Sequence, residues 1–512
     1  MDARTDGVTV DVAVVGAGLA GLAAAATAAS AGRTVLLLDG HPGGGRAATD
    51  QVGRYRFNRG AHALSTTGPG RQVLRDLGVR VAGSPPALRG ARARLGDRVG
   101  LAPGGAVSLA RTDLLTLREK VVLGRLLAGV RRWRPEELAG LTAAEWFDDL
   151  GLEGTARYML EMVTRVATYA ADLDVVSADM VAAQVRAALA GVEYLHHGWS
   201  TLVDGLTAAC WDRGAHLAPS GPAAAADGGP LTGPGVDAKG SGPASGRPWP
   251  AGAGAEGSGS VDGRAWLAGA DVERPGPVDG GAGADEGEEP GAAGGRVRRV
   301  VPEGGRVRVE LEDGVVLARR VVVAAGAPGA AARLLPDGAA GWGSLGPAAR
   351  IAGLDLGVRE VPQVQVLFGL DRALYLSCHA PAASGLAPPG AASVQLMWYL
   401  RADEDPSPDE ARATFTEHAR LAGVDAGSAE EARYLHRMVA VSAQPTPATG
   451  GLRGRPTVTD SGVDGVLLAG DWIGPTGYLA DASLVSGVAA ARAAVEGIDR
   501  EATTHPVSEP AA

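Results

Sequence analysis

The chain has 512 residues, with 58 acidic and 48 basic side chains and a formal charge of −10. This length predicts two to three domains, and the acidic balance excludes nucleic-acid binding and a polybasic membrane patch, so a small molecule is the expected partner. The two cysteines have no metal-ligand spacing, which argues against a disulfide framework or a zinc site and favours a cytoplasmic protein.

The first predicted elements form a βαβ unit. Residues 8–15 are an apolar, β-rich run, residues 19–31 are rich in alanine and leucine, and residues 34–38 form a second short apolar run. Glycines and Arg33 interrupt this stretch, and no basic segment precedes it, so we predict neither a signal peptide nor a transmembrane segment. The pattern leaves a peripheral membrane contact open and carries no signal for an oligomeric state.

A glycine motif lies between the first predicted strand and the helix, and an acid, Asp39, ends the second strand. In a GxGxxG turn, the first glycine permits the tight turn, the second lets a pyrophosphate approach, and the third lets the helix pack on the strand. The helix N-terminus attracts phosphate, and the carboxylate can accept ribose hydroxyls. We therefore predict a dinucleotide site formed by Gly16, Ala17, Gly18, Leu19, Ala20, Gly21 and Asp39.

A second match to the same motif, residues 252–257, lies in a low-complexity stretch with no strand before it and no helix after it. We assign it no function, because the motif binds a dinucleotide only in the strand–turn–helix context. One dinucleotide site remains, which disfavours bound NAD(P)H reducing a separate flavin.

A helical region is predicted from about residue 110 to residue 190. Thr142 and Glu145 have the spacing of a capping box, and Ser177 can begin a second helix with Val181 and Val185 on one face. This pattern is typical of a helical insertion that covers an active site rather than a continuation of the first sheet.

Residues 219–295 are rich in Gly, Pro, Ala, Ser and Asp and have no sustained period, which predicts disorder. The flanking runs 215–217 and 297–301 resemble the two sides of one interrupted β-unit. We expect further strands at 306–311, 315–325 and 465–468, an antiparallel sheet that includes 363–368 and 393–400, and a last helix over 479–495.

Two further segments favour FAD over NAD, because a flavin needs a second, distant half-site. The first holds the small residues and the arginine that can follow the cofactor, namely Gly45, Arg46, Gly60, Ala61 and His62. The second holds a carboxylate after a strand and the amides that begin the last helix, namely Gly470, Asp471, Leu479 and Ala480.

Candidate catalytic side chains are few, and we assign none. Arg46 has the alternative of a solvated surface arginine, and His62 that of a structural histidine that bonds the backbone, which is the commoner role. Trp472 can border the flavin ring or fill the core. His196 and His197 are interpreted as structural, and Cys210 and Cys378 as buried apolar side chains.

These motifs together resemble the FAD-binding parts of the phytoene desaturase and flavin amine oxidase superfamily. The resemblance covers the first 65 residues or so, residues 297–326 and residues 460–495, and residues 374–377 and 387–390 look more like phytoene desaturases. It implies that Val297 lies against the adenine. It also implies an α/β fold, a two-dinucleotide-binding-domain flavoprotein with a Rossmann-like FAD domain and a helical plus antiparallel-sheet substrate domain.

The expected domains follow from these segments. The FAD domain is expected to consist of three parts: residues 1–95, residues 196–218 together with 296–335, and residues 451–500. The helical cap is expected to consist of residues 96–195. The substrate-domain sheet takes 336–450, and 219–295 and the tail 501–512 are disordered.

The expected activity is dehydrogenation of a small, largely apolar substrate by hydride transfer to flavin, with dioxygen or a quinone-like carrier as acceptor. An amine or amino-acid oxidase is the first alternative. Amine-oxidising relatives commonly hold a lysine at the flavin, but this chain has only Lys120, in the predicted cap, and Lys239, in the low-complexity stretch. The second alternative is a non-catalytic carrier of a prenyl or other hydrophobic ligand on the same fold.

Overall fold

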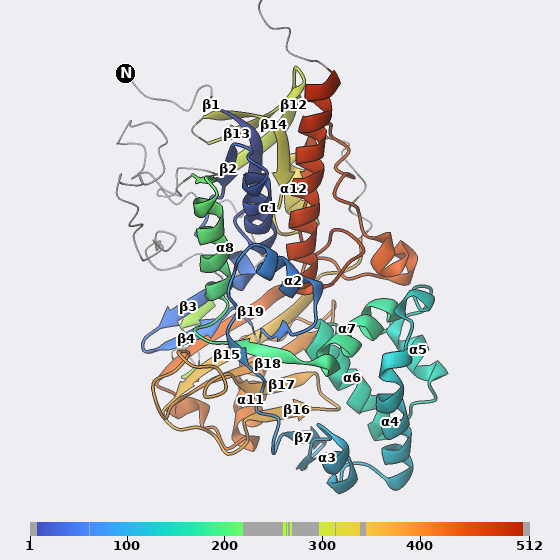
Figure 1. Cartoon of the computed structure of the whole chain (residues 1–512). Coiled ribbons are helices and arrows are strands. Elements are labelled where there is room, and N and C mark those ends of the chain that lie inside the picture. The colour runs from blue at the N-terminus through green and yellow to red at the C-terminus, as the bar shows by residue number, and fades with distance from the viewer. Residues whose placement is uncertain are drawn as a thin grey trace, which may run out of the picture.

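The computed structural model describes residues 8–60, 62–218, 260–262, 264, 267–268, 296–312, 314–337, 342 and 345–504. Two large sheets lie one above the other in Figure 1, with a group of helices beside the lower one. No helix in these ranges is both long enough and apolar enough to cross a bilayer.

The upper sheet contains the predicted βαβ unit. Its seven strands have the order β10-β2-β1-β14-β13-β12, with β20 paired to β14. The parallel strands β1 (Val8–Val15), β2 (Val35–Leu38), β14 (Val315–Val323) and β20 (Val466–Leu468) form its centre. Their β-branched and leucine side chains within 12–15, 35–38, 321–323 and 466–468 are buried, as expected for strands covered on both faces, whereas those at 8–10, 315 and 317 are partly buried or exposed.

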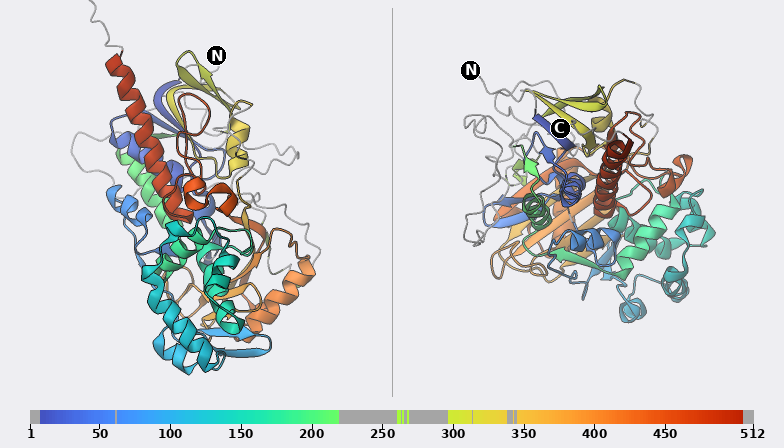
Figure 2. Two further views of the ribbon diagram at one scale, coloured as in Figure 1. Left: turned by 90° about the vertical axis from the view of Figure 1, so that its right-hand side faces the viewer. Right: turned by 45° about the horizontal axis from the view of Figure 1, so that its top comes forward.

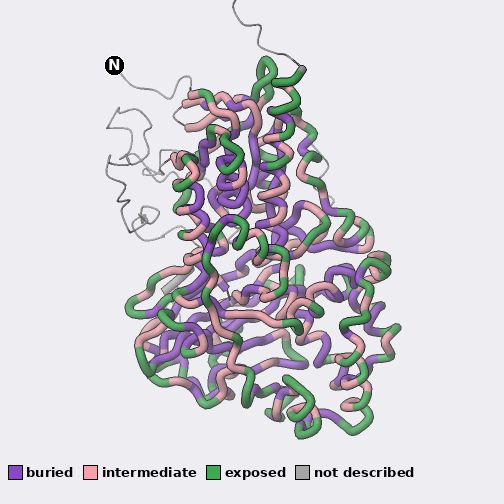
Figure 3. Tube along the Cα trace, viewed as in Figure 1, coloured by how far each residue is buried: buried purple, intermediate pink, exposed green. Residues whose placement is uncertain are grey.

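Helices cover this upper sheet. α1 (Leu19–Ser30) packs against α8 (Ser200–Asp212) and α12 (Leu479–Thr504), and the three run side by side in Figures 1 and 2. Ten of the twelve α1 residues are buried, because alanines allow helices and sheet to approach closely on every side. Figure 3 shows this buried centre in purple. α12 continues beyond the residue 495 expected from the sequence.

The lower sheet has eight strands in the order β11-β19-β15-β18-β17-β16-β7-β8. The central strands are antiparallel, as predicted: β15 (Ala349–Val358), β17 (Leu374–Cys378), β18 (Ala392–Leu400) and β19 (Glu431–Val441). α11 (Pro408–Leu421) covers one face, where Phe415 packs among leucines. The other face is turned toward the cap and the cofactor loops.

The helical cap is α3 (Ala106–Arg111), α4 (Leu117–Gly129), α5 (Ala143–Asp149), α6 (Gly154–Thr168) and α7 (Ala178–Ala190). The predicted capping box is present, since Thr142 Oγ1 accepts from the Glu145 amide at 3.2 Å and Glu145 Oε2 accepts from the Thr142 amide at 2.8 Å. Ser177 precedes α7, but its hydroxyl donates to Asp179 at 2.7 Å instead of capping the helix.

Two small sheets connect the large ones. β3 (Thr49–Val52) pairs with β4 (Tyr55–Asn58), and β9 (Val192–Leu195) joins β5 (Leu64–Ser65) to β6 (Gly83–Ser84). The segments expected at 306–311 and 363–368 are β13 (Arg306–Leu311) and β16 (Val366–Gly369).

The interrupted β-unit predicted across the insertion is wrong. β10 (His216–Leu217) pairs with β2 at one edge of the upper sheet, whereas β12 (Val297–Glu303) pairs with β13 at the opposite edge. Both runs have strand composition, but composition does not specify the neighbour.

The expected boundary at residue 95 also shifts. β7 (Arg92–Leu95) pairs in parallel with β16, and β8 (Arg98–Leu101) pairs with β7, so both strands belong to the lower sheet. The chain therefore enters the substrate sheet before it forms the cap.

Part of the predicted disordered insertion is ordered. β11 (Ser260–Asp262) pairs with β19 at the edge of the lower sheet, and the motif match at 252–257 lies outside the described residues. The tail after residue 504 is also outside them.

We predict that deleting residues 221–257 leaves FAD content and soluble yield unchanged, because loop-closure entropy changes slowly with length. Deleting 221–294 also removes β11 and uncovers the backbone of β19, and an open sheet edge favours aggregation. Size-exclusion chromatography of both variants checks this, and equal loss of soluble protein in both would show that the glycine-rich part itself is needed.

Candidate cofactor and substrate site

The glycine turn has the geometry that the sequence predicts. Gly16 has φ +106°, and a Cβ there would lie 2.5 Å from the carbonyl oxygen of Ala324 at the end of β14. A Cβ on Gly21 would lie 1.8 Å from the Gly16 oxygen. Gly18 differs, since no atom of the described residues other than its own chain neighbours lies within 4 Å of its Cβ position. The first and third glycines therefore close the turn, and the second faces open space.

The N-terminus of α1 lies at this open space. No side chain caps α1, and its first turn, which includes Leu19 and Ala20, has no acidic residue. No side-chain carboxylate therefore competes with a ligand for the first amides of α1. Free amides at a helix N-terminus are the groups that bind phosphate.

Asp39 lies beside the turn and already holds two backbone amides. Its carboxylate accepts from the Ala17 amide at 2.6 Å and from the His41 amide at 2.9 Å, one on each oxygen. A carboxylate has about four lone-pair sites, so acceptor capacity remains for ribose hydroxyls.

Val297 lies near Asp39, although the two residues are far apart in sequence. A Cβ on Gly40 would lie 3.0 Å from the Cβ of Arg296, so the start of β12 packs against the residue that follows Asp39. Val297 itself is partly buried at the edge of the core. The placement of Val297 against the adenine stays a prediction.

Arg46 and Asp471 form a buried ion pair that the sequence did not indicate. Arg46 donates to both carboxylate oxygens, Nη1 to Oδ2 at 3.0 Å and Nη2 to Oδ1 at 2.8 Å. Burial alone would lower the pKa of Arg46, but the Asp471 charge raises it. Burial alone would raise the pKa of Asp471, but Arg46 lowers it. Arg46 is therefore not the solvated surface arginine considered as an alternative.

Two further residues fix this pair, and sequence reasoning missed both. The Ser442 amide donates to Asp471 Oδ2 at 3.0 Å, and Arg455 donates to the carbonyls of Asp471 at 3.0 Å and Gly477 at 2.7 Å. Arg455 is 6% exposed, and no carboxylate of the described residues bonds its guanidinium, so burial lowers its pKa to about 10. Neither residue belongs to a recognisable motif, since each acts through a loop that only the fold brings close.

His62 has the structural role that is commoner for histidine. Its Nε2 lies 3.0 Å from the Arg46 carbonyl, and its ring meets Trp199 edge-on at 4.9 Å. Burial lowers the pKa of His62 to about 4, so the ring is neutral at pH 7. Gly60 packs directly against this ring, and Ala61 lies outside the described residues.

The strand before His62 is anchored to the lower sheet by a polar network. Arg433 donates to the Asn58 carbonyl at 2.7 Å and to Asp355 at 2.6 Å, and Gln395 donates to Asp355 at 3.1 Å. Arg433 also pairs with Asp50. The cofactor loop is thereby fixed to the sheet face that is turned toward the cap.

The C-terminal segment begins at Gly470, whose amide donates to the Ser486 hydroxyl at 2.9 Å. Leu479 has φ +54° and begins α12, with Ala480 in its first turn. The next amide, of Asp481, is already used, since it donates to the Tyr478 carbonyl at 3.1 Å.

The remaining candidates are mainly structural. Trp472 is 1% exposed and donates to the Gly326 carbonyl at 3.0 Å, so it fills the core and ties β20 to β14. His196 accepts from the Ser384 amide at 3.0 Å. Cys210 and Cys378 are buried free thiols, as predicted.

Two family models match the sequence on these segments. A model described as an NAD(P)-binding Rossmann-like domain matches residues 14–78, and one described as a flavin containing amine oxidoreductase matches residues 293–495. The chain is an FAD-dependent oxidoreductase. The second match supports the flavin amine oxidase part of the resemblance and favours an enzyme over a carrier.

Solved structures show the same fold for this oxidoreductase. An oxidoreductase from Methanosarcina mazei aligns with TM-score 0.60 and 15% identity over 94% of this chain and 99% of that one. A putrescine oxidase bound to putrescine aligns with TM-score 0.65 and 15% identity over 96% and 100%. Cyclohexylamine oxidase from Brevibacterium oxydans aligns with TM-score 0.60 and 16% identity over 96% and 100%. No curated protein matches the chain.

The geometry of the oxidoreductase fits FAD. The Gly44 amide donates to the Ala17 carbonyl at 2.9 Å, so the second glycine loop lies against the first. The Cβ positions of Gly18 and Gly45 both meet no protein atom within 4 Å. At these two glycines the loops present backbone without side chains. A pyrophosphate that contacts the backbone requires such a surface.

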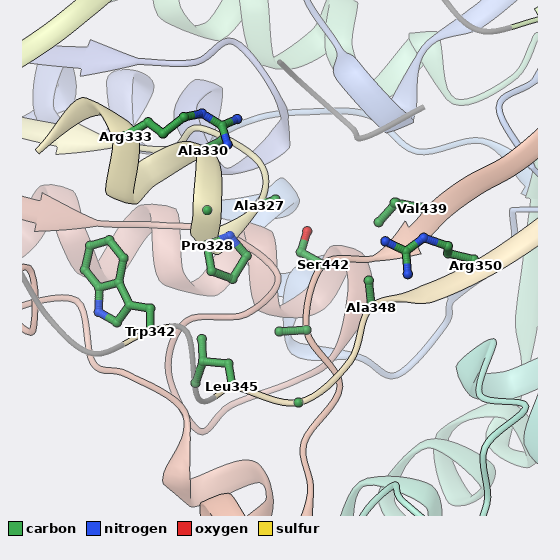
Figure 4. Close-up of a pocket in the computed structure, with 13 residues that line it drawn as sticks. Ala327, Pro328, Ala330, Arg333, Trp342, Leu345, Ala348, Arg350, Val439 and Ser442 are labelled. Carbon is green, nitrogen blue, oxygen red and sulfur yellow. The ribbon is translucent and has the colours of Figure 1, made fainter. Parts of the chain in front are cut away.

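A cavity of about 230 Å³ opens on the other side of the Asp471 loop. Arg333 of α10 (Pro328–Leu334) and Arg350 of β15 come to it from different elements, and Ser442 lies between them in Figure 4. Because the Ser442 amide also bonds Asp471, this cavity adjoins the proposed cofactor site.

Proposed function

We propose that the oxidoreductase dehydrogenates a small, uncharged and largely apolar substrate held between α6 and the lower sheet. FAD, when bound, supplies the hydride acceptor. The residues proposed to hold it are Gly16, Ala17, Gly18, Leu19, Ala20, Gly21, Asp39, Gly45, Arg46, Gly60, Ala61, His62, Val297, Gly470, Asp471, Leu479 and Ala480.

The observation that carries this proposal is the neutrality of the buried face where cap, sheet and cofactor loops meet. Burial lowers the pKa of His62 to about 4 and that of His379 to about 3, so both are uncharged. Arg165 is occupied, since it donates to the Leu370 carbonyl at 2.9 Å and lies near Glu161. The charged side chains near this face are paired, Arg46 with Asp471 and Arg433 with Asp355, so a charged substrate would lose its hydration here without gaining an unpaired counter-charge from either pair.

The cap supplies an apolar wall. Met159, Leu160 and Met162 of α6 are buried in one cluster with Tyr399 of β18 and Tyr478, next to the first turn of α12. The same stripe is what a plain helix core shows, so it supports an apolar substrate only together with the neutral face. These residues would exclude water and orient the reacting C–H bond.

Amine oxidation is the second candidate. The matched family model and the similarity to putrescine oxidase and cyclohexylamine oxidase favour it. The lysine-assisted form of that reaction is not supported, because the only lysine in the described ranges, Lys120, lies partly buried on α4 and donates to the Ala110 carbonyl at 2.9 Å.

We predict that Lys120→Met leaves turnover unchanged, and that reduced flavin forms with a hydrophobic polyene or similar alkyl substrate but not with primary amines or amino acids. Anaerobic loss of the flavin absorbance near 450 nm, followed by stopped flow, measures this. Rapid bleaching by a primary amine would overturn the proposal and establish the oxidase.

A further inference from the structure

The two faces of β17 and β18 differ in chemistry. Leu374, Leu376 and Cys378 of β17 pack into the cluster beneath α11. The alternate residue Tyr375 belongs to the cap-side cluster, and Ser377 and His379 continue its spacing of two along the chain. The sheet thus directs a row of polar and aromatic side chains toward the helical cap, where the substrate is proposed to bind.

Two members of this row, Ser377 and His379, have buried polar atoms without a hydrogen-bond partner among the described residues, and His379 is the larger of the two. It is 1% exposed, and neither ring nitrogen has a hydrogen-bond partner among the described residues. The backbone is fixed, since the His379 amide donates to the Ser393 carbonyl at 2.9 Å and its carbonyl accepts from the Ala383 amide at 2.7 Å. A neutral imidazole has one donor and one acceptor, and leaving both unpaired in the interior is costly.

The surroundings of His379 explain why its ring stays where it is. The ring stacks on Tyr194 of β9, with centroids 3.9 Å apart and planes at 23°. The Tyr194 and Tyr375 hydroxyls lie 3.1 Å apart and bond each other. The stacking holds the imidazole in place, while one of the two phenols donates to the other.

The groups around His379 are uncharged. Burial raises the pKa of both Tyr194 and Tyr375, so the phenols stay protonated. His62 lies close enough to influence the pKa of His379, is neutral itself, and has its Nε2 3.0 Å from the Arg46 carbonyl. A ligand at this place is therefore next to the cofactor loop and meets hydrogen-bonding groups without a counter-charge.

We propose that His379 is a specificity-determining residue that receives an uncharged hydrogen-bonding group, such as a hydroxyl, a carbonyl or a carboxamide, on a substrate with an otherwise apolar body. This inference rests on the proposed function and narrows its substrate class. His379 positions the substrate and takes no part in the chemistry.

The test uses FAD-loaded protein and four small probes of one size. Benzamide and benzyl alcohol carry an uncharged polar group, toluene carries none, and benzylamine is charged at pH 7. Each probe is titrated while the flavin difference spectrum and the Tm are recorded. Wild-type protein should bind benzamide and benzyl alcohol more tightly than toluene.

His379→Phe keeps the stacking ring and removes both nitrogens. We expect the Kd for benzamide and benzyl alcohol to rise at least about tenfold and the Kd for toluene to stay the same. The Tm without probe should not fall, since an unpaired buried polar group is removed. His379→Gln retains a donor and an acceptor, so it should keep part of the preference for the polar probes over toluene. This variant replaces His379→Phe in the test if the phenylalanine variant does not fold.

His418→Phe is the matched control, because His418 is fully buried beneath the same sheet on α11, with Nε2 3.3 Å from the Leu367 carbonyl. It should not change the preference among probes. Equal probe affinities in wild type and His379→Phe, or no binding of either polar probe to wild type, would overturn the inference. Tight binding of benzylamine with bleaching would instead overturn the proposed function.

Discussion

Gly18→Val should yield folded protein that purifies without FAD. Gly18 has φ −76° and ψ −179°, an extended conformation that valine adopts readily, and no protein atom lies within 4 Å of its Cβ position. The new side chain would therefore cost the apoprotein little and would fill the space that a pyrophosphate needs. We expect flavin retention to fall more than tenfold, which corresponds to at least about 1.4 kcal/mol of binding free energy.

The ratio of absorbance at 450 nm to that at 280 nm measures flavin content, and circular dichroism checks the fold. Gly140→Val is the matched control, because the Cβ position of Gly140 in the cap is equally open and distant from the turn. Stoichiometric FAD in Gly18→Val would contradict the site. Unfolded Gly18→Val protein would contradict the view that the space is free of protein atoms.

Asp471→Ala should have a second large effect, on stability as well as on flavin content. Asp471 is 3% exposed, and its removal leaves Arg46, which is 24% exposed, without a counter-charge. Breaking one side of a fully buried pair typically costs about 3–5 kcal/mol of unfolding free energy, and the partial exposure of Arg46 places the expected cost at the lower end of that range. Asp148→Ala is the control, because its carboxylate pairs with Arg157 but is 69% exposed, where about 0.2–1 kcal/mol is expected.

A double variant separates the two roles of Asp471. Arg46→Met with Asp471→Leu removes both buried charges, so urea unfolding should show much of the lost stability restored. Flavin retention should stay low if the pair also holds the cofactor. Full flavin retention in the double variant would show that the pair is only structural.

The pH dependence of the Asp471 contribution has a definite sign. The folded-state pKa of Asp471 lies below its ordinary value, so the unfolded chain binds the proton more readily. The stabilisation is therefore complete above the ordinary carboxyl pKa and is lost as the pH falls through the folded-state pKa. Asp471→Ala should unfold with a weaker acid dependence than wild type.

The sequence by itself determined the first βαβ unit and the cofactor. The run 8–15, the glycine turn and Asp39 are contiguous, so local spacing alone fixes their geometry, and the structure reproduces it. The capping box of Thr142 and Glu145 was predictable for the same reason. Each of these features depends on residues a few positions apart, where backbone geometry leaves few alternatives.

Only the tertiary structure decided the contacts between distant segments. Arg46 and Asp471 are 425 positions apart, and either could have faced solvent, so their pairing depends on the way β20 lies beside β14. The partners of β10 and β12 were likewise not encoded in their composition. His379 is an ordinary residue in the sequence, and its unpaired ring nitrogens appear only when β17, β9 and the cofactor loop enclose it. Strand pairing and burial arise from the packing of the whole chain, and a local pattern does not contain that information.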